Sequence, residues 1–71
     1  MSKLSFNAFC IEMYAEHSGK PSPDVYGMFE RTGLLGMLDA DYEDLHGMSW
    51  ESLMQMFDEY LSGTGRAEAS A

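Results

Sequence analysis

The stretch FNAFCIEMYAEH, residues 6–17, decides the fold of this chain because its apolar side chains recur at helical spacing. Residues three and four positions apart share one face of a helix. On this face the sequence places Phe6, Phe9, Cys10, Met13 and Tyr14. Ile11 and Ala15 flank this stripe and widen the apolar surface, which is typical of a central helix. We predict a helix that Ser5 caps at its N-terminus and that stops at Gly19.

Two further segments show the same helical spacing. The triplet Ser22-Pro23-Asp24 is typical of a helix start, with Ser22 as the N-cap, and Gly33 is expected to end this second helix. Ser49 is expected to cap a final helix that ends at Gly63. The apolar residues of these two helices are Val25, Met28 and Phe29 in the first, and Trp50, Leu53, Met54, Phe57, Tyr60 and Leu61 in the second.

The segment between these helices, residues 34–45, combines an apolar cluster interrupted by Gly36 with an acidic run. It predicts one or two short helical turns. No stretch shows the sustained alternation of a strand. The sequence therefore predicts an all-α fold, a small single-domain bundle of three main helices plus a short helical connector. We expect this helical domain to occupy residues 1–63, followed by a flexible C-terminal tail at residues 64–71.

The chain is strongly anionic, because 71 residues include twelve carboxylates and only four Lys or Arg, for a net charge of −8. Such a charge repels phosphate backbones, so we expect no direct nucleic-acid binding, and it favours a basic protein surface as partner. No apolar run approaches the roughly 18 residues that cross a bilayer, and the N-terminus lacks export features. With Cys10 as the single cysteine, a reducing, cytoplasmic location without membrane attachment is expected.

No catalytic or metal site is predicted. The acidic run Asp39–Asp44 begins like an EF-hand loop, but glycine is missing at position six and Trp50 replaces the glutamate of position twelve. His17 and His46 lie too far apart in sequence to form a ligand pair. Cys10 lies on the apolar stripe, which favours a small buried side chain over a nucleophile. We therefore expect neither enzyme activity nor a bound cofactor or metal.

The remaining hypothesis is a protein-interaction module that uses acidic helix faces and a few exposed aromatic residues. The residues expected to contact the partner are Glu12, Glu16, Tyr26, His46 and Trp50. Two alternatives stay open. One is a DNA-mimicking inhibitor of a nucleic-acid-binding protein, in which the Asp39–Asp44 carboxylates imitate phosphates. The other is a structural homo-oligomer, such as a homodimer, whose apolar faces complete one another.

Several motifs also resemble a known family. The resemblance is carried by Phe9-Cys10-Ile11-Glu12-Met13-Tyr14-Ala15, by Val25-Tyr26, and by the turn Tyr42-x-x-Leu45-His46. Over about residues 6–61 the chain resembles DUF3791, an uncharacterised family of short bacterial proteins. The resemblance implies a small acidic helical protein. Some members are encoded beside an ADP-ribosyltransferase-like protein, which implies an antitoxin-like role toward that partner. The Gly47–Trp50 turn departs from the more polar turn expected there.

Overall fold

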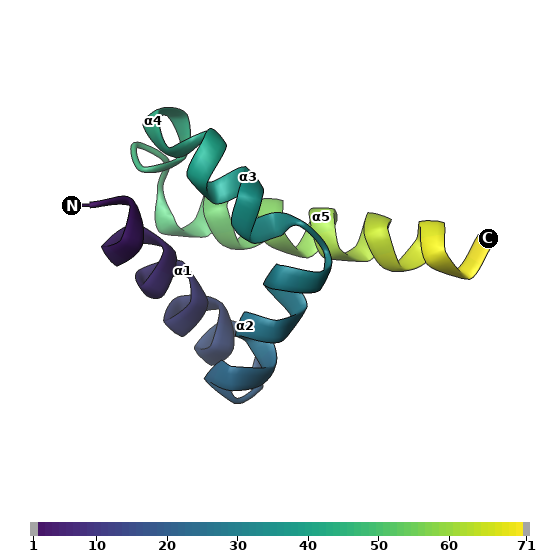
Figure 1. The fold of residues 1–71 in the computed structure, drawn as a ribbon. Coiled ribbons are helices and arrows are strands. Elements are labelled where there is room, and N and C mark those ends of the chain that lie inside the picture. The colour runs from purple at the N-terminus through teal and green to yellow at the C-terminus, as the bar shows by residue number, and fades with distance from the viewer. Residues whose placement is uncertain (1, 71) are drawn as a thin grey trace.

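The computed structural model describes the backbone of residues 2–70 and the side chains of residues 2–63. Within this range the chain forms five helices and no strand, so the predicted all-α class is confirmed. The helices are α1 Lys3–Ser18, α2 Ser22–Arg31, α3 Leu34–Ala40, α4 Tyr42–Leu45 and α5 Trp50–Ser70 (Figure 1). α1 packs against α2, α3 and α5, which makes it the central helix of the domain.

The connector between α2 and α5 is more substantial than the sequence suggested. It consists of two helices rather than one or two irregular turns, separated at Asp41, where φ is −105° and ψ is 22°. Leu34 and Leu38 of α3 are fully buried, and Leu45 of α4 is 5% exposed. The reason is that α3 packs on both α1 and α2, so its apolar residues belong to the main core.

The start of α1 lies earlier than predicted. Ser2, not Ser5, is the N-cap, because its side-chain oxygen accepts a hydrogen bond of 3.1 Å from the backbone N–H of Ser5. The predicted stop is confirmed, since Gly19 adopts a left-handed conformation with φ of 74° and its N–H binds the carbonyl of Ala15.

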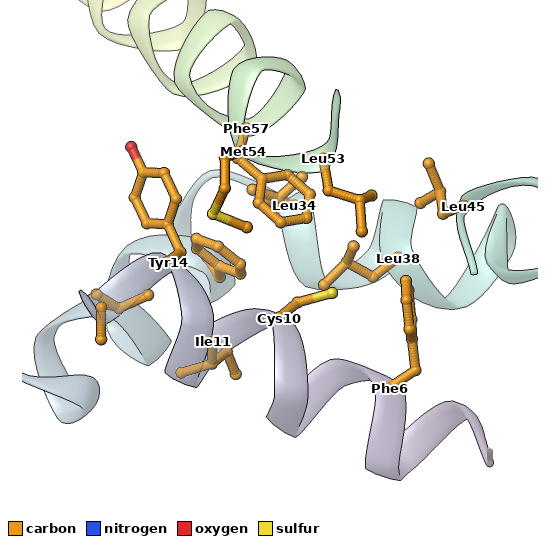
Figure 2. Close-up of a cluster of buried hydrophobic side chains, with 13 residues drawn as sticks. Phe6, Cys10, Ile11, Tyr14, Leu34, Leu38, Leu45, Leu53, Met54 and Phe57 are labelled. Atoms are coloured by element: carbon orange, nitrogen blue, oxygen red, sulfur yellow. The ribbon is translucent and has the colours of Figure 1, made fainter. Parts of the chain in front are cut away.

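The core is a single cluster to which all five helices contribute (Figure 2). At its centre three aromatic rings from different helices meet. The centroids of Phe29 and Phe57 lie 5.4 Å apart, and that of Tyr14 lies 5.6 Å from Phe29. The buried residues are Phe6, Cys10, Ile11, Tyr14, Ala15, Val25, Phe29, Leu34, Leu38, Leu45, Leu53, Met54 and Phe57.

One part of the predicted apolar stripe on α1 is wrong. Phe9 is 41% exposed, whereas Ile11 and Ala15, expected beside the stripe, are buried. α1 has neighbours on more than one side, because α2 and α3 pack on it as well as α5. The buried face is therefore displaced toward Ile11 and away from Phe9.

The ends of α2 and α5 also differ from the predictions. The N-cap of α2 is Pro21, and Ser22 is already the first helical residue, so Pro23 occupies the second position. Ser49 caps α5 as predicted, because its hydroxyl accepts a hydrogen bond of 3.2 Å from the Ser52 N–H. The predicted end at Gly63 is wrong, since α5 continues to Ser70 and extends past the other helices (Figure 1). The side chains of residues 64–71 lie outside the described residues, and the flexibility of that tail stays a prediction.

Candidate functional site

An apolar groove lies between α1, α2 and α3, with a volume of about 270 Å³. We call it the α1–α2–α3 groove. It is lined by Leu4, Asn7, Ala8, Ile11, Tyr26 and Leu35. Ile11 at its base is buried, whereas Leu4 and Tyr26 are 81% and 49% exposed. The groove therefore presents large apolar side chains to the outside, next to the core.

The side-chain oxygen of Asn7 in this groove is buried and accepts no hydrogen bond within the described part of the chain. Water cannot compensate a fully covered acceptor, so such an oxygen costs roughly 1–3 kcal/mol when it stays unpaired. Buried polar atoms in folded proteins almost always have partners. The side-chain oxygen of Asn7 is therefore a buried, unpaired hydrogen-bond acceptor in the described part of the free protein.

Each of the three helices that form the groove also carries an exposed carboxylate close in sequence to a lining residue. Residues four positions apart on a helix are neighbours on its surface. Glu12 follows Ala8 by one turn on α1, Glu30 follows Tyr26 on α2, and Asp39 follows Leu35 on α3; these three carboxylates are exposed. Each of the three helices therefore places a negative charge about one turn from a residue of the groove lining.

The five residues predicted to contact a partner are all exposed, and the structure distributes them over separate places. Tyr26 lines the groove, and Glu12 lies one helical turn beyond Ala8, which also lines it. Glu16 lies one turn further along α1, toward its C-terminus. Of the five, only Tyr26 lines the groove.

The other two predicted residues make local aromatic contacts. Trp50, 42% exposed at the start of α5, lies with its ring centroid 6.4 Å from that of His17, in an edge-to-face arrangement. The ring of His46 stacks on Tyr42 at 4.7 Å, and its Nδ1 lies 2.9 Å from the Tyr42 carbonyl oxygen. His46 thereby helps to close α4 before the turn into α5.

A polar cluster joins the C-terminal part of α1 to α5. The Tyr14 hydroxyl donates a hydrogen bond of 2.6 Å to Asp58 Oδ1, and His17 Nε2 lies 2.9 Å from Asp58 Oδ2. The hydrogen bonds from Tyr14 and His17 lower the pKa of Asp58. Burial, followed by the bond to Asp58, raises the pKa of Tyr14 to about 12. This phenol stays protonated at neutral pH, so the cluster offers no activated nucleophile. Its hydrogen bonds instead fasten α1 to α5.

Cys10 is fully buried, and burial raises the pKa of its thiol to about 12. The thiolate is the reactive form, so this side chain is chemically inert in the folded state. Among the described side chains, no three His, Cys, Asp or Glu residues lie close enough to hold a metal ion together. Within the same range, none of the helices combines the length and the apolar character that a bilayer crossing requires.

The fold and the groove define a class: a small all-helical domain with an open apolar groove between acidic helix faces. The chain belongs to the family DUF3791, described as a protein of unknown function, whose family model matches residues 5–63. No curated protein and no solved structure matches the chain.

Sequence reasoning missed most of the groove. Leu4, Asn7, Ala8 and Leu35 were not among the predicted contact residues. A signal was present, because Leu4, Ala8 and Ile11 are spaced four and three residues apart and so share one face of α1. That face is distinct from the stripe of Phe6 and Cys10. The pattern alone gives no indication that α2 and α3 would leave it partly open.

Proposed function

We propose that this chain is an acidic protein-interaction module that binds a protein partner in the cytoplasm. The observation that carries the proposal is the α1–α2–α3 groove, where exposed Leu4 and Tyr26 lie beside carboxylates on a protein of net charge −8. Exposed apolar side chains clustered beside a cavity are typical of binding surfaces. The negative field speeds the approach of a basic partner. A reducing compartment suits the single thiol of Cys10.

The partner class we propose is an ADP-ribosyltransferase-like protein that this chain neutralises in the manner of an antitoxin. The proposal follows from the resemblance to DUF3791, some of whose bacterial members are encoded beside such a protein. Binding, rather than chemistry, is the mode of action that suits this chain. Its buried thiol and its hydrogen-bonded phenol are both held in their protonated forms.

The test is co-expression of the chain with an ADP-ribosyltransferase-like protein encoded beside a family member. We expect a complex that elutes as one species at modest salt and relieves growth inhibition caused by the enzyme. Doubling the ionic strength should lower the association rate constant and change the dissociation rate constant little, because charges at the rim of an interface act mainly on the rate of association. Separate elution together with unrelieved growth inhibition would refute the proposed partner.

The DNA-mimic alternative makes a different prediction for the same assay. Asp39, Asp41, Glu43 and Asp44 are exposed on α3, α4 and the residue between them. Neutralising Asp41, Glu43 and Asp44, while Asp39, one turn from Leu35 of the groove, is kept, should leave the proposed complex intact. If the variant instead stops inhibiting a DNA-binding protein, the acidic run is a phosphate mimic.

A further inference from the structure

We infer that the α1–α2–α3 groove binds a basic amphipathic helix of the partner, with apolar residues facing the groove and Lys or Arg at its flanks. The inference rests on the proposed function and deepens it, because it names the surface and the chemistry of the segment bound there. Helix-in-groove recognition uses anchors at i, i+3, i+4 and i+7, which lay one apolar face of the bound helix into a groove of this kind.

The charges beside the groove select the occupant. Glu12, Glu30 and Asp39 are exposed, and each lies one helical turn beyond a residue that lines the groove. A bound helix with Lys or Arg beside its apolar face would meet a carboxylate on each of the three helices. A second copy of this chain would bring carboxylates against carboxylates at a net charge of −8 per chain, and like charges brought together disfavour the pair. Charge complementarity therefore favours a basic segment over self-association.

Asn7 supplies the specificity that an apolar groove lacks. Its covered side-chain oxygen has no donor in the free protein. A partner segment whose binding shifts the side chains that cover this oxygen could place an N–H of Lys, Arg or Gln against it, in a site shielded from water, where a hydrogen bond is strong. The cost of the unpaired oxygen is thus removed only when the correct segment is bound. A segment without a donor at that point would leave it unpaired.

A second hollow, formed by described residues of α5, gives no comparable argument for a ligand. It is lined by Asp58, Glu59, Ser62 and Gly63 of α5 alone and is open. Asp58 there is already bound to Tyr14 and His17. The carboxylate of Asp58 thus already has hydrogen-bond partners within the chain.

The test is a titration of the isotope-labelled full chain with a synthetic helical peptide of about 18 residues, followed by NMR. The peptide carries Leu at i, i+3, i+4 and i+7, Lys at the positions beside this apolar face, and Ala at the remaining positions. A control peptide replaces each Lys by Glu. We expect saturable shifts at the groove residues of α1, α2 and α3 with the Lys peptide, and none with the Glu peptide. Shifts spread evenly over the acidic surface, or centred on Asp58 and Glu59, would overturn the inference.

Two matched variants sharpen the test. Tyr26→Gln removes a half-exposed aromatic ring from the groove, and Phe9→Gln removes one, 41% exposed, that does not line it. We expect about tenfold weaker peptide binding for Tyr26→Gln, because a central aromatic anchor contributes more than 1 kcal/mol. Phe9→Gln should bind within about twofold of the parent. Equal effects of the two variants would contradict the inference that the peptide binds in the α1–α2–α3 groove.

The Asn7→Leu variant tests whether the Asn7 oxygen takes part in binding, because it should change stability and peptide affinity in opposite directions. The variant should unfold at a higher urea concentration, because it removes an unpaired buried oxygen, and yet bind a Lys-bearing peptide more weakly. Greater stability with unchanged binding would overturn the role of Asn7.

The same variants separate this inference from the proposed function. If Tyr26→Gln still forms the complex with the ADP-ribosyltransferase-like protein as tightly as the parent, the groove is the wrong surface while the module remains an interaction protein. If the Lys peptide binds the groove but no such complex forms, the proposed partner is wrong and the groove stands.

Discussion

The hydroxyl of Tyr14 in α1 donates a hydrogen bond of 2.6 Å to the carboxylate of Asp58 in α5, joining residues 44 positions apart. The ring of Tyr14 lies in the core, and its hydroxyl reaches the edge of the cluster (Figure 2). His17 approaches the second oxygen of the same carboxylate at 2.9 Å. α5 is thus held to the C-terminal part of α1 by directional bonds in addition to apolar contact.

This fastening predicts a defined pH dependence of stability. The pKa of Asp58 is lowered below 3.8 in the folded state, so its contribution is present above that pH and is lost as the pH falls through the folded value. The pKa of Tyr14 is raised from 10.0 to about 12, so its contribution is present below pH 10.0 and is lost as the pH rises toward 12.

Urea unfolding followed by the fluorescence of Trp50 checks this dependence. At pH 7 we expect Asp58→Asn and Tyr14→Phe each to lower the free energy of unfolding by about 1 kcal/mol, a modest value because Asp58 is half exposed and screened by water. The difference between the parent and Asp58→Asn should shrink at pH 3. A difference that grows toward acid would contradict the assigned role of Asp58.

Replacing two glycines near α3 by alanine should change the stability of the fold in opposite directions. Gly33 adopts φ of 82°, and a Cβ there would lie 3.4 Å from the Tyr60 hydroxyl, which donates a 2.8 Å bond to the Thr32 carbonyl. Gly33→Ala should therefore destabilise the fold by roughly 1–2 kcal/mol. Gly36 lies inside α3 with open space around its Cβ position, so Gly36→Ala should stabilise by roughly 0.5–1 kcal/mol. Thermal melting of the two variants measures the contrast, and shifts of the same sign would contradict it.

The burial of Cys10 predicts that its thiol is strongly protected from chemical modification in the folded protein. It is fully buried and its pKa lies near 12, so a chromogenic disulfide reagent at pH 8 should modify it only through unfolding. The labelling rate should rise steeply with urea and should fall in the stabilised Gly36→Ala variant. Native labelling as fast as that of the urea-unfolded chain would show that the thiol is accessible.

Truncation of Phe29 and truncation of Phe9 to alanine should lower the free energy of unfolding by very different amounts. Phe29 is fully buried and packs against Tyr14 and Phe57, so Phe29→Ala should cost about 3–5 kcal/mol and prevent stable folding of so small a domain. Phe9 is 41% exposed, and Phe9→Ala should cost about 1 kcal/mol or less. Circular dichroism melts distinguish the two outcomes, and similar melting temperatures would contradict the core assignment.

The core helices could be predicted because their signals are local. Apolar spacing over residues 6–17 and the Pro23-Asp24 start identify α1 and α2, and Ser49 identifies the start of α5. Gly19 and Gly33 both adopt the left-handed conformation that ends a helix. Periodicity depends on neighbouring residues only, so the sequence by itself locates the helices, whereas two of the predicted N-caps, Ser5 and Ser22, are replaced by Ser2 and Pro21.

Only the tertiary structure decided which apolar residues became core and which became surface. Phe9 and Ile11 are both apolar residues of α1, and the positions of α2, α3 and α5 bury one and expose the other. The groove depends in the same way on how three helices meet around Asn7 and Tyr26. Helical spacing fixes the angle of a side chain about its own helix axis, but burial depends on where neighbouring helices pack, and those contacts join residues distant in sequence.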